Sequence, residues 1–312
     1  MTPRTVSLAG RFFRINTTDE TDVEEREFQL LRPIGSGGQA RVYLAESRGE
    51  RFVIKEPHPD LAAWTDRATT HVLRFKRELR NHAKCRHPSL IELHGALNAA
   101  GRWYAVMEFF DGITIREWLL EIGLLDETRT LEVGIEIARG LAAMHRAGIV
   151  HRDLSESNVL VRQGPNSTSI KIIDFGIAKS RSTTDAISMV DEFVGTLRYS
   201  PPERILGQSS VDETIDIYAV GALLYHLLTG RYAFSQQDKM GLMGALARYG
   251  LGNQGVESPK DLVPGISPET SATVLRAMAG RPEHRYQSSE ELLAALFDCR
   301  LRLFEKRIAT RE

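Results

Sequence analysis

The stretch HRDLSESN, His151–Asn158, combines an acid and an amide at a short, fixed spacing. A carboxylate such as Asp153 can accept or orient the proton of an attacking hydroxyl. The amide oxygen of Asn158 is a ligand for Mg²⁺, and IIDFG further along the chain places Asp174 at the end of an apolar strand, where its carboxylate is a second oxygen ligand. These residue types indicate the metal-assisted transfer of a phosphoryl group.

A glycine-rich stretch and a strand-end lysine offer places for phosphates. The sequence IGSGGQARV, Ile34–Val42, lies between two expected strands, where glycines let backbone N–H groups approach an anion. No helix ending in Gly-Lys-Ser/Thr follows it, which excludes a Walker-type loop. Lys55 ends the apolar strand FVIK and would hold phosphates if Glu78 fixed its ammonium. The alternative is a lysine whose stem lies along the strand while its ammonium stays in water.

The elements that must position these residues divide the chain into two parts. Short β-rich runs separated by glycine or charged turns predict an antiparallel meander from Phe28 onward, with a helix near residues 69–85 and strands near 90–97 and 103–110. After residue 120 the chain becomes mainly helical, with apolar residues at helical spacing, and Ser267 and Ser288 stand where helix N-caps are expected. This α+β pattern predicts two lobes with a cleft between them.

Composition narrows the class of protein. The chain has 312 residues with 40 Lys and Arg against 41 Asp and Glu, so no net field would attract nucleic acid or a membrane. Residues 1–27 end in an acidic run and are expected to form a solvated, poorly ordered tail. The stretch MTPRTVSLAG has no apolar signal-peptide region, so no signal peptide is expected, and the longest apolar run is too short to span a bilayer. Cys85 and Cys299 are expected to be reduced thiols in a cytoplasmic protein.

Taken together, the chain resembles a eukaryotic-type (Hanks-type) serine/threonine protein kinase catalytic domain, over about Phe28–Leu301, and GSGGQARVYLAE is similar to bacterial members. The resemblance implies a two-lobed kinase-like fold that binds ATP and Mg²⁺, or Mn²⁺ in its place, and acts on protein substrates. Its expected parts are the N-terminal tail 1–27, a β-rich N-lobe of about 28–107, a hinge 108–112, a helical C-lobe of about 113–301, and the end of the C-terminal helix, 302–312.

The resemblance assigns roles to individual residues. Asp153 would act on the substrate hydroxyl, Lys55 would pair with Glu78, and Thr196 would be directed at Asp153. Asn158 and Asp174 would hold the metal. The nucleotide would contact Ile34, Gly35, Ser36, Gly37, Gly38, Gln39, Ala40, Arg41, Val42, Val53, Lys55, Met107, Glu108, Phe110 and Leu160. Outside the site, Asp216 would brace the catalytic loop and Arg285 would pair with Glu203.

Four positions depart from the family pattern: Ser155 replaces a lysine, Ala40 the third glycine, Val53 an alanine over adenine, and His82 a leucine. They leave open a nucleotide-binding pseudokinase scaffold beside the active kinase. A small-molecule phosphotransferase of related fold is a third reading, which VGTLRYSPPE disfavours because it resembles a peptide-docking platform. Thr196 favours serine/threonine over tyrosine specificity.

Control through the loop after Asp174 is also expected. In related kinases an arginine at the position of Arg152 joins a basic pocket that grips a phosphorylated loop, and Arg74 and Lys179 would complete such a pocket here. The candidate phosphosites are Ser188, the leading one, Thr184 and Thr183. Autophosphorylation between two copies would require dimerisation. Asp191 and Glu192 could instead mimic the phosphate.

Overall fold

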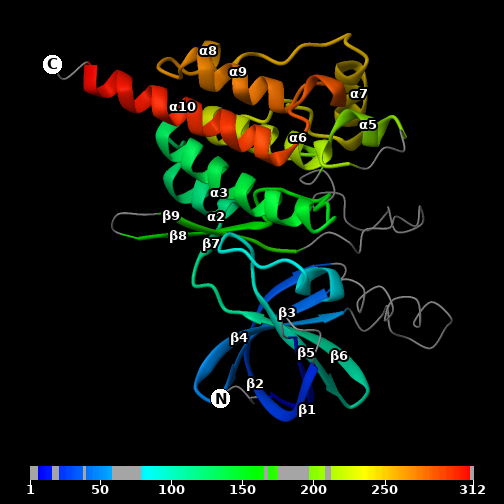
Figure 1. Ribbon diagram of the computed structural model, residues 1–312. Helices are drawn as coiled ribbons and strands as arrows, with labels where there is room; N and C mark the ends of the chain where they lie inside the picture. The colour runs from blue at the N-terminus through cyan, green and yellow to red at the C-terminus, as the bar shows by residue number, and fades with distance from the viewer. Residues whose placement is uncertain are drawn as a thin grey trace. The chain divides into compact units, whose positions relative to one another are not determined.

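The computed structural model describes residues 6–15, 21–37, 40–57, 79–164, 168–174, 197–207 and 212–309. They form two compact units that divide between Asp111 and Gly112, within the stretch expected to be the hinge. One unit is built mainly of strands and the other mainly of helices (Figure 1).

The strand-rich unit is a closed antiparallel barrel with the strand order β1-β2-β3-β4-β6-β5. Its strands are β1 (Val6–Ile15), β2 (Thr21–Gly37), β3 (Ala40–Ser47), β4 (Glu50–Pro57), β5 (Leu93–Ala99) and β6 (Arg102–Glu108). Residues 79–83 are helical, residues 84 and 85 are not, and residues 69–78 of the expected helix lie outside the described residues.

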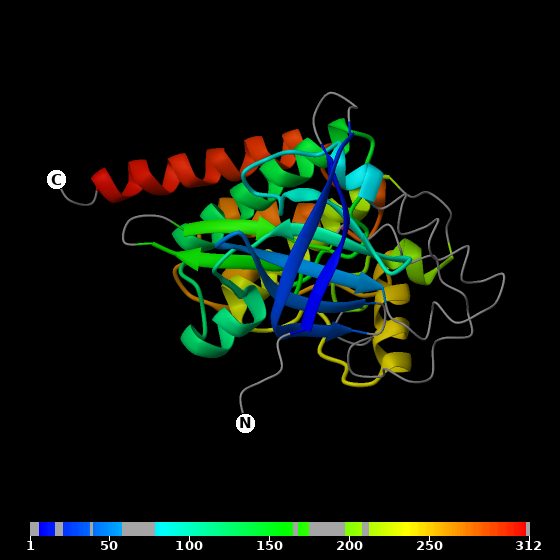
Figure 2. The ribbon, with the colours of Figure 1, turned by 90° about the horizontal axis from the view of Figure 1, so that it is seen from below.

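The N-terminal stretch forms strands, so the expectation of a poorly ordered tail is wrong for residues 6–15 and 21–27. β1 pairs with β2 along its whole length, and the two long strands lie side by side (Figure 2). On its other side β1 pairs with β5, from Arg11 opposite Asn98 to Arg14 opposite Gly95. The stretch therefore closes the barrel instead of preceding it.

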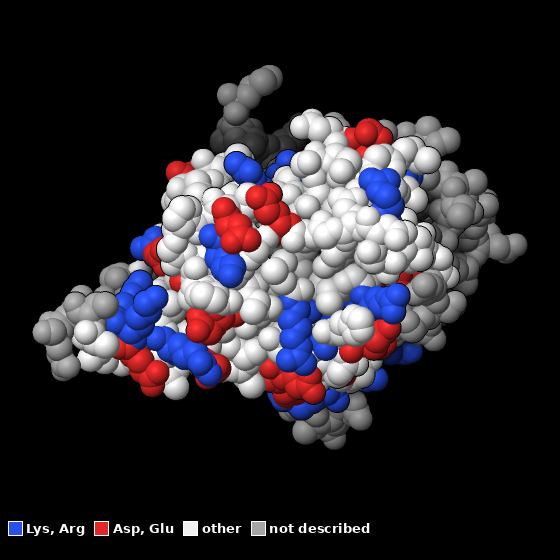
Figure 3. Space-filling model, turned by 90° about the horizontal axis from the view of Figure 1, so that it is seen from above, with Lys and Arg blue, Asp and Glu red and all other residues white. Residues whose placement is uncertain are grey.

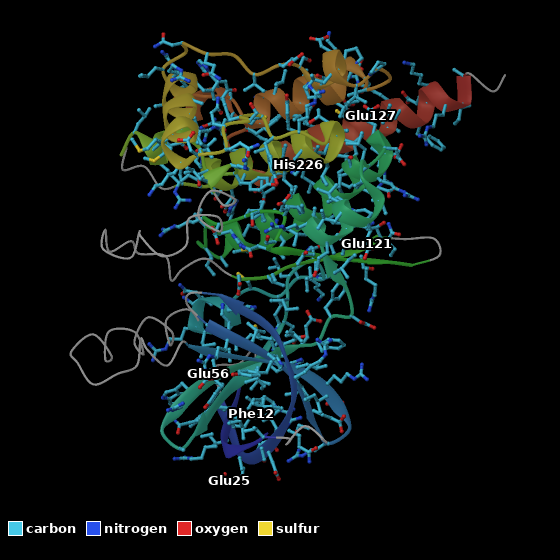
Figure 4. All side chains as sticks on the ribbon, turned by 180° about the vertical axis from the view of Figure 1, so that it is seen from behind. Phe12, Glu25, Glu56, Glu121, Glu127 and His226 are labelled. Carbon is cyan, nitrogen blue, oxygen red and sulfur yellow. The ribbon has the colours of Figure 1, made fainter. Side chains whose placement is uncertain are left out.

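The acidic run follows the period of a strand, which explains why it is part of the sheet. Arg26 and Phe28 are buried, whereas Glu25 and Glu27 are exposed. Successive side chains of a strand point to opposite faces, so the carboxylates face solvent while their neighbours face the core. Figure 4 shows Phe12 within the barrel and Glu25 pointing away from it.

Two glycines allow β1 to approach β5. A Cβ at Gly10 would lie 2.2 Å from the carbonyl oxygen of Asn98, and a Cβ at Gly95 would lie 2.3 Å from that of Phe13. No real side chain fits at such distances, so the pairing that closes the barrel needs glycine at both positions.

Aromatic side chains fill the barrel. The rings of Phe12 and Phe28 meet edge to face at 5.9 Å between centroids, and those of Phe28 and Phe52 at 5.5 Å. The guanidinium carbon of Arg26 lies 4.9 to 5.2 Å from all three ring centroids, within cation–π range, and its Nε donates to Ser47 Oγ at 3.1 Å. The side chains on the other face of these strands are therefore on the outside of the barrel.

The helical unit begins with a small sheet of order β7-β8-β9, formed by Ile113–Thr114, Val159–Gln163 and Thr168–Ile172. Its helices are α2 (Ile115–Ile122), α3 (Glu127–Arg146), α5 (Pro202–Ile205), α6 (Thr214–Thr229), α7 (Lys239–Gly250), α8 (Pro259–Leu262), α9 (Pro268–Ala277) and α10 (Ser289–Ala309), with a 3-10 turn at Pro282–His284.

Helix α6 is the centre of this unit. Of its 16 residues only His226 is not buried, and α3 and α9 pack against it (Figure 1). Ser267 Oγ accepts from the N–H of Thr270 at 3.2 Å and Ser288 Oγ from that of Glu291 at 3.1 Å, which confirms both as caps.

The mixed surface charges and the two free thiols agree with what the composition predicts. Figure 3 shows acidic and basic side chains interspersed on the face in view. Within the described ranges no helix is long and apolar enough to cross a membrane. Both cysteines are buried free thiols, and burial raises the pKa of Cys85 to about 11, which disfavours its reactive thiolate at neutral pH.

Candidate functional site

The loop between Asp153 and Asn158 is closed by hydrogen bonds from one amide. Asn158 Nδ2 donates to the main-chain oxygen of Asp153 at 2.7 Å and to its Oδ2 at 3.1 Å. The main-chain N–H of Asn158 donates to Ser155 O at 3.0 Å. Both partner atoms are oxygens of Asp153, so the side-chain atom of Asn158 that faces them is the amide nitrogen, which donates. The other side-chain atom, Asn158 Oδ1, is the one that can bind a cation.

Asp216 braces this loop from the buried start of α6, as expected. Its carboxylate accepts from the N–H groups of His151 at 2.7 Å and Arg152 at 2.8 Å, and lies 2.9 Å from His145 Nε2. Burial raises the pKa of Asp216, but the hydrogen bond from His145, the nearby His151 and the Arg152 N–H outweigh burial, so the pKa lies below its usual value. Asp216 therefore remains a carboxylate that holds two successive amides.

The backbone is strained at two points of the site. Arg152 has φ 66° and Asp174 has φ 55°, a region that costs energy for residues other than glycine. At Arg152 the contacts that hold it are visible: Asp216 holds its N–H, and Arg204 Nη1 donates to its carbonyl at 2.6 Å. Such conformations occur where the surrounding structure over-determines them, often at functional sites.

Asp174 follows a residue that is bonded to the same loop. The N–H of Ile173 donates to Asn158 O at 2.9 Å, and His151 Nε2 donates to Ile173 O at 3.1 Å. The side-chain oxygens of Asn158 and Asp174 are the ligand type that Mg²⁺ prefers. Among the described residues no group of three or more His, Cys, Asp or Glu could hold a metal. A cation here would complete its ligands with phosphate or water, as Mg²⁺ commonly does.

The barrel brings the expected nucleotide-binding residues of the strand-rich unit onto neighbouring strands. Val42 lies opposite Lys55, Lys55 opposite Ala105, and Val53 opposite Met107. Directly opposed residues share a face, and Ile54 between them points into the core, so these side chains all lie on the outside of the barrel.

The structure also shows the two ends of this outer face of the barrel. Gly37 lies opposite Ala40, so the glycine-rich stretch is a hairpin between β2 and β3. At the other end the Glu108 N–H donates to Glu92 O at 3.0 Å, and the Glu108 carboxylate accepts from the Glu92 N–H at 2.7 Å. Phe110 is buried and belongs to the same unit, whereas Leu160 belongs to β8 of the helical unit.

Several expected residues lie outside the described residues: Gly38, Gln39, Arg74, Glu78, Lys179, Thr183, Thr184, Ser188, Asp191, Glu192 and Thr196. The Lys55–Glu78 pair therefore stays a prediction. His82 is described, and its effect on the alignment of the site stays untested. It is buried, and its Nε2 lies 2.7 Å from Ile91 O, so the imidazole that replaces a leucine has a hydrogen-bond partner.

The expected pair of Arg285 and Glu203 is present. Arg285 Nη1 donates to Glu203 Oε1 at 2.8 Å and Nη2 donates to Oε2 at 2.7 Å, with both side chains almost fully buried. This bidentate geometry is the strongest form of such a pair. It fixes α5, and with it the segment Leu197–Glu203, to the helical unit.

One group in the loop was missed by the motif reading. Glu156, between Asp153 and Asn158, is buried and bonded to the hydroxyls of Tyr199 and Tyr232. The only signal in the sequence was a carboxylate within an otherwise small and polar stretch. The motif could not indicate its partners, because they lie far away in the sequence.

The protein kinase domain family model matches residues 28–295, and the chain therefore belongs to the protein kinase family. Among curated relatives it is 32% identical over 292 residues to serine/threonine-protein kinase PrkC of Bacillus subtilis, covering 91% of this chain and 42% of PrkC. It is 33% identical over 275 residues to serine/threonine-protein kinase PknB of Mycobacterium leprae, covering 86% and 42%. The expected protein kinase family is confirmed, and the curated relatives named here are serine/threonine-protein kinases. The chain spans less than half the length of these relatives.

Solved structures confirm the expected fold. The PknI kinase domain of Mycobacterium tuberculosis superimposes with a TM-score of 0.63 at 24% identity, covering 87% of this chain and 96% of that chain. Rad53 in complex with AMP-PNP superimposes with a TM-score of 0.67 at 27% identity, covering 85% and 64%.

Proposed function

We propose that this chain transfers the γ-phosphate of ATP to serine and threonine hydroxyls of proteins. The observation that carries the proposal is the loop in which Asn158 holds Asp153 and Asp216 holds the two residues before it. Asp153 orients the substrate hydroxyl and accepts its proton. Because these contacts hold the Asp153 carboxylate in place, it is pre-organised for that step.

The nucleotide is assigned to the outer face of the barrel. Val53, Met107, Glu108 and Phe110, with Leu160, would contact adenine, while the hairpin backbone and Lys55 would contact the phosphates. The complex of Rad53 with AMP-PNP supports a nucleotide as the ligand. Asn158 and Asp174 would hold Mg²⁺, which neutralises phosphate charge when bound.

Transfer of labelled phosphate from ATP to a generic protein such as casein tests the activity, with Asp153→Asn as the matched control. We expect transfer by the wild type and a loss of about 10²-fold or more in the variant, the scale of a general base. A folded wild-type protein that binds Mg·ATP but transfers nothing would support the pseudokinase reading instead.

Asp174→Ala is expected to weaken Mg·ATP binding more than Asn158→Ala. Asp174 carries a formal charge, whereas Asn158 offers a neutral oxygen. Titration of each variant with ATP at fixed Mg²⁺, and again in EDTA, measures the metal-dependent part of the affinity. Equal losses in the two variants would contradict the ranking.

Regulation by autophosphorylation of the loop after Asp174 is part of the proposal, with Ser188 as the leading site and Thr184 and Thr183 as the others. Arg152 is exposed, so its guanidinium is accessible to a phosphate. Phosphorylation of one copy by another would require at least transient dimerisation.

Intact-mass measurement and peptide mapping of wild type beside Asp153→Asn test this regulation. We expect phosphate on the loop of the wild type only, and a lower activity in Ser188→Ala. A fully active wild-type enzyme with an unmodified loop would exclude it.

A further inference from the structure

Glu156 is the centre of a buried polar cluster in the helical unit. Its Oε2 accepts from the Tyr199 hydroxyl at 2.9 Å and lies 3.2 Å from His226 Nδ1, while its Oε1 accepts from the Tyr232 hydroxyl at 3.2 Å. The side chain of Glu156 is 9% exposed and that of His226 is 11% exposed. A buried carboxylate with three partners is costly to assemble and stable only when every partner is in place.

The protons of the cluster can be assigned from the partners. Glu156 as a carboxylate only accepts, so the single hydroxyl proton of Tyr199 is donated to it. Tyr199 Oη also lies 3.0 Å from His226 Nδ1, but the Tyr199 hydroxyl proton is already donated to Glu156. His226 Nδ1 must therefore carry a proton, which it donates toward Tyr199 Oη and Glu156 Oε2.

The cluster joins the catalytic loop to the segment that follows Thr196. Tyr199 belongs to Leu197–Glu203, whose far end is held by the Arg285 pair. His226 lies near the end of α6, and its ring contacts that of Tyr232 at 4.1 Å between centroids, with the two planes tilted by 49°. The Glu156 carbonyl also accepts from the Arg116 N–H at the start of α2, at 3.1 Å.

The charges around the cluster favour the ionised acid. Burial raises the pKa of Glu156, but the hydrogen bond and charge of His226 and the hydroxyls of Tyr199 and Tyr232 outweigh it, and the pKa lies below its usual value of 4.5. The other charges near Tyr232 are both positive. The guanidinium carbon of Arg198 lies 4.1 Å from its ring centroid, and Arg116 acts on it electrostatically.

We propose that Glu156 is a positioning residue, which docks Leu197–Glu203 onto the catalytic loop through Tyr199 and so sets the affinity for the protein substrate. The proposal rests on the protein kinase activity proposed above. Glu156 itself touches no reacting atom. It acts by keeping Tyr199, and the segment that carries it, at a fixed position relative to Asp153.

Steady-state kinetics of Glu156→Gln and Tyr199→Phe, with a protein substrate and with ATP varied in turn, test the role. Each variant removes a hydrogen bond to a charged group or the charge itself, and such bonds correspond to about a tenfold to hundredfold change in an equilibrium. We expect KM for the protein substrate to rise by about tenfold or more, with kcat and KM for Mg·ATP nearly unchanged.

Tyr249→Phe is the matched control. It also removes one tyrosine hydroxyl from the helical unit, a donor to Met278 O at 2.9 Å, but that hydroxyl has no bond to the catalytic loop. Its Tm should fall like that of Tyr199→Phe while its kinetic constants stay at wild-type values. His226→Asn, whose amide nitrogen can replace Nδ1 as the donor, should stay closer to wild type than His226→Ala.

Amide hydrogen exchange of peptides covering residues 197–207 provides a readout that does not require activity. We expect faster exchange there in Glu156→Gln than in Tyr249→Phe at neutral pH.

The outcomes separate the two proposals. A wild type that transfers no phosphate overturns the proposed function, and exchange then still decides whether Glu156 docks the segment. An active wild type whose Glu156 and Tyr199 variants change only in Tm, in proportion to Tyr249→Phe, overturns the positioning role. Unchanged exchange over residues 197–207 in Glu156→Gln overturns it as well.

Discussion

Lys55→Met is expected to reduce phosphate transfer by about 10²-fold or more, the scale of losing one electrostatic donor, while the barrel remains folded. Lys55 is half-buried on the outer face of β4, opposite Val42 and Ala105, and its strand pairing is made by the main chain. Methionine preserves the unbranched stem that packs on this face and removes only the ammonium.

The measurement is kcat with Mg·ATP and a protein substrate, together with a thermal unfolding curve for each variant. Lys84→Met, at an exposed position of the same unit, is the control and should keep both values. If Lys55→Met retained more than a tenth of the wild-type turnover, the role assigned to Lys55 would be wrong. A large fall in Tm would instead show that the lysine is needed for folding.

Glu203→Leu is expected to lower the free energy of unfolding by about 3–5 kcal/mol, because it leaves the guanidinium of Arg285 buried without its partner. Arg285 is 1% exposed, so water cannot replace the lost carboxylate. The double variant Glu203→Leu with Arg285→Met removes both charges and should be more stable than Glu203→Leu alone. It should not recover fully, since Ala279 O and Thr214 O also lose a donor from Arg285.

Denaturant unfolding of both single variants and the double variant gives the coupling between the two residues. Destabilisations that simply add would contradict a buried pair that acts as a unit. Asp298→Ala is a useful comparison, because its pair with Arg302 is exposed on α10 and should contribute little.

The motifs predict contacts between residues that lie a few positions apart in one loop. Asp153, Asn158 and Asp174 were identified from residue type and local pattern, and the bonds of Asn158 within its own loop agree with that reading. The contacts of Asp216 with the catalytic loop and of Arg285 with Glu203 span long stretches of sequence. They were predicted only because the resemblance to a known family carried them, and the structure contains both.

The strands of the N-terminal stretch could not be predicted from motifs. The acidic composition of residues 1–27 predicts a solvated tail, whereas the alternation of Glu25, Arg26, Glu27 and Phe28 is that of a strand. An alternation of buried and exposed residues over only four positions does not by itself specify a strand, because a strand also needs a neighbouring strand to pair with. Here that partner is β1, whose glycine-dependent approach to β5 closes the barrel.

The sequence by itself determined the family, and it predicts the class of chemistry and the residues that would carry it. Phosphoryl transfer requires a few side-chain types at short spacings, and such spacings can be recognised within short stretches of sequence. Only the tertiary structure decided that the barrel closes and that Glu156 is bonded to Tyr199, Tyr232 and His226. Both depend on which groups meet across long separations. The free energy of a buried carboxylate is set by those neighbours, which folding alone brings together.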